Sequence, residues 1–219
     1  TFNYIKNWYI INNNKMNIVN ILKLKTVDDT LCPKILDSLY SSINFSLSRY
    51  EMLKTTEQLN KIKDNKGVIT VQFQGLPFIV FFCLIDNKKY NLLISKRELK
   101  TERNKNNIRD VKIYHMFLQF VKPEYYNGTV LDGKIIKNDK MAHSFIIHEL
   151  YNKSLSNTDI DKKYDIVDKD FMPSLSRFNN KLDFRIARLY EYSDLSTLLF
   201  DKLPKSQSKI IGLMFLSRV

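Results

Sequence analysis

Glycine, proline, cysteine and tryptophan are scarce in this 219-residue chain, which has five glycines, five prolines, two cysteines and one tryptophan. Two cysteines cannot form a disulfide framework or a zinc knuckle, and His115, His143 and His148 lack metal-binding spacing. No run of 18 apolar residues occurs, so we expect no transmembrane helix. The start, Thr1-Phe2-Asn3, has neither a signal-peptide pattern nor an initiator methionine. The absences favour an intracellular fragment or processed product, with no cofactor or metal indicated.

Acidic residues are outnumbered, because 35 lysines and arginines face 23 aspartates and glutamates, for a net charge of +12. A surface of this charge attracts polyanions at long range, which makes nucleic acid a candidate partner. The excess is mostly lysine and accompanies many asparagines and isoleucines, a bias typical of an AT-rich genome. Codon drift is therefore an alternative explanation of part of the charge.

The order of the predicted elements is helices first and strands afterwards, which predicts an α+β protein and argues against a doubly wound parallel sheet. Helical spacing follows Pro33, through residue 43, and a second helical stretch covers about 47 to 62. A polar loop is expected from 152 to 181, and a short helix capped by Ser193 or Asp194 ends at Leu203. Strands are predicted at 68–73, 78–85, 90–95, 111–121, 129–136, 144–150, 184–190 and 210–216.

Four strand segments carry glycines or acidic groups in a distinctive order. The first ends in Gln72-Phe73-Gln74-Gly75-Leu76-Pro77, and the second contains Thr129-Val130-Leu131-Asp132-Gly133-Lys134. The third is Phe145-Ile146-Ile147-His148-Glu149-Leu150, and the fourth is Ile211-Gly212-Leu213-Met214-Phe215. This order, over about two thirds of the chain, resembles the covalent nucleotidyltransferase superfamily of mRNA-capping guanylyltransferases and ATP-dependent DNA and RNA ligases. The capping enzymes of large DNA viruses look nearest.

The resemblance implies two mostly antiparallel sheets with N-terminal helices. It divides the chain into an N-terminal segment, 1–66, whose helices pack on the core, and a nucleotidyltransferase-like core, 67–219. The family's last motif, a Lys-x-Lys strand, and its OB-fold domain are absent from this sequence. The implied remnant of a nucleotide pocket consists of Gln72, Gln74, Gly75, Pro77, Asp132, Gly133, Lys134, Glu149, Ile211 and Gly212.

The chain departs from the family where the family performs catalysis. Gln72 stands where the family has the lysine that attacks the α-phosphate, and an amide nitrogen is not a usable nucleophile. Gln74 and Pro77 replace the motif aspartate and the following arginine. Lys134 replaces a metal-contacting glutamate, which reverses the charge, and apolar Ile211 replaces an acidic residue. No catalytic residue is therefore predicted.

Several alternatives stay open for single residues. Gln72 and Gln74 are either solvent-facing strand residues or pocket remnants, and Asp132 is either a turn cap or a nucleotide contact. Lys66 or Lys134 could supply a displaced nucleophile, whereas His148 is expected to be a half-buried structural histidine. Phe73, Phe78, Tyr125 and Tyr126 are candidates for stacking on RNA bases, although aromatic strand residues are more often core.

The expected function is a catalytically inactive guanylyltransferase-like or ligase-like domain. It would serve as an interaction or scaffold subunit in a viral-type transcription or RNA-processing complex, in the host cytoplasm or the virion. Its expected partners are polymerase or capping subunits, with RNA or a cap as a further ligand and no membrane. The alternatives are an active capping enzyme or ligase with a non-standard nucleophile, and a structural protein with a chance similarity.

Overall fold

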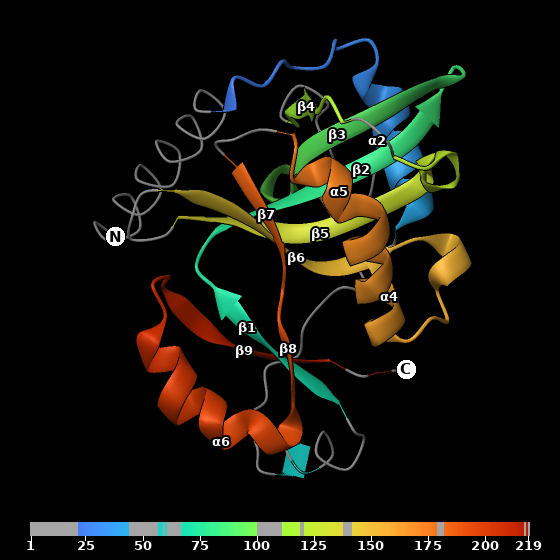
Figure 1. Cartoon of the computed structure of the whole chain (residues 1–219). Helices are drawn as coiled ribbons and strands as arrows, with labels where there is room; N and C mark the ends of the chain where they lie inside the picture. The colour runs from blue at the N-terminus through green and yellow to red at the C-terminus, as the bar shows by residue number, and fades with distance from the viewer. Residues whose placement is uncertain are drawn as a thin grey trace.

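Two β-sheets form the frame of the molecule in a computed structural model (Figure 1). The structure describes residues 22–43, 57–58, 60, 67–99, 111–118, 121–137, 142–178, 182–216 and 218. The large sheet has six strands in the order β4-β3-β2-β5-β6-β7, and the small sheet has three in the order β8-β1-β9. The predicted α+β class with two mostly antiparallel sheets is confirmed.

The large sheet consists of β2 (Leu76–Ile85), β3 (Lys88–Ser95), β4 (Ile113–His115), β5 (Asn127–Lys137), β6 (His143–Tyr151) and β7 (Leu182–Ile186). Every pair is antiparallel except β6 and β7. The predicted β2–β3 hairpin closes through Asp86 and Asn87, whose φ angles of 50° and 61° suit a tight two-residue turn.

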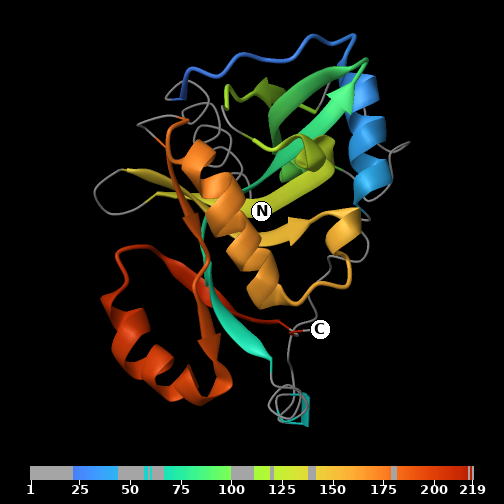
Figure 2. The same ribbon diagram turned by 45° about the vertical axis from the view of Figure 1, so that its right-hand side comes forward.

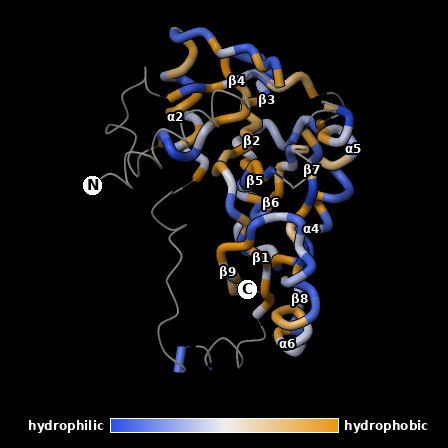
Figure 3. The backbone as a smooth tube through the Cα atoms, turned by 90° about the vertical axis from the view of Figure 1, so that its left-hand side faces the viewer, coloured by the Kyte–Doolittle hydropathy of each residue, from blue (hydrophilic) through white to orange (hydrophobic). Residues whose placement is uncertain are grey.

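Helices cover both faces of the large sheet (Figure 2). Helix α2 (Cys32–Ser42) buries Ile35, Leu36 and Leu39 against β2 and β5, as its helical spacing predicts. On the other face lies a continuous helical segment made of α4 (Ile160–Ile166), a π-helical turn (Val167–Phe171) and α5 (Met172–Leu175). Hydrophobic residues gather along the strands, whereas α4 is largely hydrophilic (Figure 3).

The small sheet consists of β8 (Leu189–Glu191), β1 (Val68–Phe73) and β9 (Ile210–Leu216). A helical segment at 192–205, which includes α6 (Leu195–Thr197), packs on one face and buries Leu198 against Ile69 and Val71. Two short connections join the sheets: Gln74 and Gly75 lead from β1 to β2, and Ala187 and Arg188 lead from β7 to β8. On the other face of β1, the Gln72 side chain contacts Lys134 of β5.

Some predicted boundaries were wrong. The described part of the predicted polar loop, residues 152–178, is largely helical, because Val167, Phe171 and Leu175 lie on one side and pack into the core. The predicted strand at 184–190 is two strands in different sheets. Of the predicted strand at 111–121, the described residues 111–118 and 121 contain β4 as their only strand. Asn127 and Gly128 begin β5 instead of forming a turn before it. Most of the predicted helix at 47–62 lies outside the described residues.

The described helices include none that is long and apolar enough to cross a membrane.

Replacing Phe171 with alanine tests whether the 160–175 helical segment belongs to the core. The Phe171 ring is fully buried and lies 4.4 Å from the ring centroid of Tyr125 and 5.1 Å from that of Phe82. We expect Phe171→Ala to lower the free energy of unfolding by about 3–5 kcal/mol in urea titrations. Phe200→Ala, at a residue that is 76% exposed, is the control and should change it by less than about 0.5 kcal/mol.

Candidate functional site

A hydrogen bond connects the two sheets where the sequence motifs meet. Lys134 of β5 donates from Nζ to Oε1 of Gln72 on β1 at 2.6 Å, and lies 3.4 Å from the carbonyl oxygen of Phe73. The amide nitrogen of Gln72 donates to Sδ of Met214 on β9 at 3.4 Å. Burial lowers the pKa of Lys134, and Asp132 opposes the shift. We call Gln72, Phe73 and Lys134 the intersheet junction.

Asp132 lies two residues before Lys134 on the same strand and forms an ion pair with Lys96. Lys96 begins the 3-10 turn that follows β3. The Asp132 side chain is 8% exposed and that of Lys96 is 23% exposed, so the pair is largely removed from water. Burial raises the pKa of Asp132, while Lys96 favours its ionised form. Because Asp132 lies inside β5, the alternative role of a turn cap was wrong.

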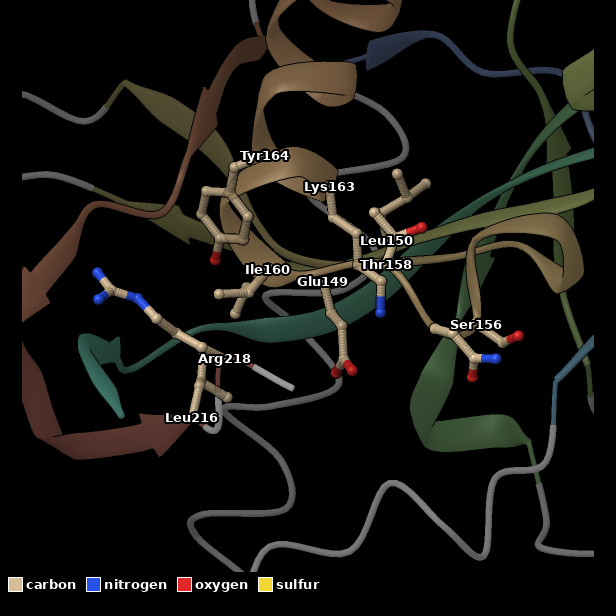
Figure 4. Close-up of a pocket in the computed structure, with 10 residues that line it drawn as sticks. Glu149, Leu150, Ser156, Thr158, Ile160, Lys163, Tyr164, Leu216 and Arg218 are labelled. Atoms are coloured by element: carbon tan, nitrogen blue, oxygen red, sulfur yellow. The ribbon is translucent and has the colours of Figure 1, made fainter. Parts of the chain in front are cut away.

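Glu149 is the partner of Asp132 in the register between β5 and β6. Its carboxylate accepts a hydrogen bond from the Tyr151 hydroxyl, and burial raises its pKa. Glu149 also lines a pocket of about 380 Å³ at the end of β6, beside the start of α4 and the end of β9 (Figure 4).

The pocket has mixed polar and apolar walls. Ile160 and Leu216 supply apolar surface, and Lys163 and Glu149 supply opposite charges. Arg218 is held at one end by ion pairs with Glu191 and with Asp161, the latter at 3.2 Å. The remaining lining residues are Leu150, Ser156, Asn157, Thr158 and Tyr164.

His148 is a buried histidine on β6, and neither of its ring nitrogens has a hydrogen-bond partner in the described structure. Burial lowers its pKa to about 4, with smaller contributions from Lys134 and Lys96. The imidazole is therefore neutral at neutral pH. The prediction of a half-buried histidine was wrong in degree, because only 4% of the residue is exposed.

Two of the motif glycines are required by close approach of neighbouring strands. A Cβ atom on Gly133 would lie 2.3 Å from the Ile146 carbonyl oxygen, and one on Gly75 would lie 2.7 Å from that of Ile135. Gly212, paired with Gln72, has open space around its Cα. Glycine at positions 75 and 133 is thus explained by the close packing of neighbouring strands.

The other predicted pocket residues are more scattered. Pro77 pairs with Lys134 in the β2–β5 register, which places it beside the junction. Gln74 is exposed, and its backbone amide donates to the Lys209 carbonyl oxygen at 2.8 Å. Ile211 is 60% exposed on β9. The strands therefore bring together Gln72, Pro77, Asp132, Lys134 and Glu149, whereas Gln74 and Ile211 face solvent.

Three of the four aromatic residues proposed to stack on bases cannot do so. Phe78, Tyr125 and Tyr126 are at most 8% exposed and belong to the core on the α4–α5 side of the large sheet. Phe73 is partly buried and packs against the apolar residues of the small sheet. The alternative that aromatic strand residues belong to the core holds for Phe78, and Tyr125 is buried against Phe171 of the helical segment at 160–175.

Sequence reasoning missed Lys96 as the partner of Asp132, and Lys163 and Arg218 as pocket residues. Lys96 follows a strand directly, at the start of a charged segment, and this position was the available signal. No sequence pattern pointed to Lys163 or Arg218, because their proximity to Glu149 depends on the positions of α4 and the end of β9.

The side chains at and beside the intersheet junction do not suit a divalent cation. Asp132 is neutralised by Lys96, Lys134 adds a positive charge, and Glu149 is engaged by Tyr151. The part of the chain that the structure describes contains no cluster of three histidine, cysteine, aspartate or glutamate side chains placed to hold a metal ion.

Comparison with known proteins gives no family for this chain. It matches no protein-family model, and a search of the curated proteins finds no match.

The buried His148 predicts a loss of stability in acid. Its pKa rises from about 4 in the folded protein to about 6.5 in the unfolded chain, so unfolding takes up a proton between these values. The part of the free energy of unfolding that depends on neutral His148 is fully present above about pH 6.5 and is lost as the pH falls toward about 4. Between about pH 7 and about pH 5 the free energy of unfolding should fall by about 2 kcal/mol from this group.

His148→Leu should remove this component of the pH dependence in urea titrations at the two pH values. His115→Leu is the control, because His115 is only partly buried and its pKa is less affected. Equal pH dependence in wild type and His148→Leu would contradict the assignment.

Proposed function

We propose that this chain is a non-catalytic nucleotidyltransferase-like domain that acts as an interaction subunit in a transcription or RNA-processing complex. The proposal combines the motif order of the sequence with the geometry of the intersheet junction. The arrangement of two sheets, with motif residues on β1, β5, β6 and β9, is compatible with the resemblance.

The observation that carries the proposal is the Lys134–Gln72 hydrogen bond. The amide of Gln72 replaces the expected nucleophilic amine, and the ammonium of Lys134 replaces the expected carboxylate. The pair is complementary in its new form, since an ammonium donates and an amide oxygen accepts. Polar groups at this position thus stabilise the contact between the sheets instead of activating a phosphate.

The neighbouring charges support the same conclusion. A metal-dependent transfer to a nucleotide needs free carboxylates close to the reacting phosphate. Asp132 is committed to Lys96, and Ile211 offers no oxygen ligand. These side chains therefore do not supply the free carboxylates that such a transfer needs.

The second candidate function is nucleotidyl transfer with Lys134 as the nucleophile, and one observation favours it. Burial lowers the pKa of Lys134, which raises the fraction of neutral amine. The neutral amine would form a P–N bond to the α-phosphorus while the P–O bond to pyrophosphate breaks, and its proton would pass to water. Lys134 donates to Gln72 and Phe73 as a positive group, which opposes this role.

Labelled nucleotide distinguishes the two candidates. After incubation of the chain with α-³²P-GTP or α-³²P-ATP and Mg²⁺ or Mn²⁺, we expect no label on the denatured protein. An acid-labile, base-stable label would contradict the proposal, and its loss in Lys134→Arg would assign the nucleophile. Gln72→Lys should also stay unlabelled, since Lys134 still opposes a cation at the junction.

The interaction role predicts a stable partner. Strand β9 forms an edge of the small sheet, has no charged residue, and exposes Ile211. Uncharged edge strands invite pairing with another chain. Affinity purification of the tagged chain from its native source should recover a larger protein in stoichiometric amount. Recovery of the chain alone, as a monodisperse monomer in size-exclusion chromatography, would contradict the scaffold role.

A further inference from the structure

Three aromatic rings form a row at the β4 edge of the large sheet. The ring centroids of Tyr90 and His115 lie 6.1 Å apart with an interplanar angle of 31°, and those of His115 and Phe117 lie 6.4 Å apart at 28°. The rings are thus roughly parallel, as in stacked aromatic groups. We call Tyr90, His115 and Phe117 the aromatic row.

Strand register places the three rings on the face of the sheet that α2 covers farther along. Tyr90 packs against the core cluster that contains Leu92 and Ile94. Leu92 pairs with His115, and the Met116 amide donates to the Asn91 carbonyl oxygen at 2.8 Å, so Phe117 lies across from Tyr90. Figure 1 shows β3 and β4 at the edge away from the small sheet.

The outer ring of the row is open to solvent. Phe117 is 71% exposed, and among the described residues its only ring contact is with His115. One side of the Phe117 ring therefore lies on imidazole, and the rest of the ring is available to a further planar group. Exposing a phenylalanine to this extent forfeits the free energy of its burial, which suggests a use for the ring.

Two lysines flank the aromatic row. Lys88 precedes Tyr90 by two residues on β3, so strand alternation puts both side chains on the same face. Lys25 lies across from His115, because its carbonyl oxygen accepts from the His115 amide at 2.9 Å and Thr26 bridges Tyr114. Neither lysine forms an ion pair with a described carboxylate, and Asp86 of the adjacent turn is already paired with Lys34 at 2.6 Å.

We propose that the aromatic row binds single-stranded nucleic acid, with bases stacked on the rings and phosphates at Lys25 and Lys88. Aromatic rings combined with unpaired cations are the chemistry that binds single strands without sequence preference. The net charge of +12 favours binding of a polyanion over binding of a protein whose surface charges are mixed. The site lies on β3 and β4, separated by β2 from β5 of the intersheet junction, so the proposal does not depend on the function assigned to the junction.

Fluorescence anisotropy with a labelled 12-nucleotide RNA, the matching DNA and the matching duplex tests the stacking. We expect the 219-residue chain to bind both single strands more tightly than the duplex. Phe117→Ala should weaken single-strand binding by about 5-fold or more, the effect of losing one stacked base. Phe200→Ala removes a similarly exposed phenylalanine from the helical segment at 192–205 and should leave binding unchanged. Tighter binding of RNA than of DNA would identify RNA as the natural ligand.

Salt titration tests the two lysines. Lys25→Gln with Lys88→Gln should make the slope of log K against log salt shallower by about 1.4, since each phosphate contact on a single strand contributes about 0.7. Lys153→Gln with Lys205→Gln removes the same net charge at two exposed positions elsewhere and should leave the slope nearly unchanged.

A tryptophan reporter gives a direct signature of stacking. In a Trp8→Phe background, Phe117→Trp should keep the affinity, and bound bases should quench its fluorescence. Three results would overturn the proposal: no single-strand binding by wild type, wild-type affinity in Phe117→Ala, or an unquenched Trp at position 117 when the strand is bound.

Discussion

The half-buried ammonium of Lys134 sets the relation between the two sheets. A charged amine that loses water needs acceptors, and here these come from β1: the Gln72 side chain and the Phe73 carbonyl oxygen. Because Lys134 is fixed on the central strand β5, the donors and acceptors align only when β1 crosses that strand at this point. Gly75 then allows the chain to pass close to β5 as it enters the large sheet.

Around this contact the carboxylates of β5 and β6 have near partners. Asp132 has Lys96, and Glu149 has the Tyr151 hydroxyl. His148 differs, since its ring nitrogens lack partners and it avoids the cost of a buried charge by staying neutral. Near the intersheet junction the polar groups are thus one ion pair, an ammonium bound to amide and carbonyl oxygens, a carboxylate bound to a hydroxyl, and one uncharged imidazole.

The sequence predicted those elements whose pattern is local. Helical spacing after Pro33 identified α2, and the apolar run with its Asp86-Asn87 turn identified the β2–β3 hairpin. The helix at 160–175 was missed because its buried residues, Val167, Phe171 and Leu175, are separated by charged and polar positions that resemble a loop. The division of 184–190 into β7 and β8 depends on which sheet each half joins, and this information is not local.

In the candidate site, too, local patterns were predictable from the sequence and contacts between distant segments were not. Of the residues that the motif order indicated, Asp132, Lys134 and Glu149 lie on the neighbouring strands β5 and β6, and Gln72 contacts Lys134 from β1. Their role as the remnant of a nucleotide pocket stays a prediction. The motif order could not supply Lys96 or Arg218, whose positions depend on chain segments that leave the sheets. Exposure was also beyond the pattern: Phe78 and Phe117 both belong to apolar stretches, yet one is in the core and the other is on the surface.

The small sheet is discontinuous in the sequence, and this affects the order of folding. Its middle strand, β1, is made of residues 68–73, whereas both of its neighbours come from residues 189–216. During synthesis β1 has no partner strand until the whole large sheet has emerged. The entropic cost of closing this long loop is small once the large sheet has shortened the distance between the loop's ends. From this topology we expect the small sheet to assemble last, on a platform that the large sheet has already formed.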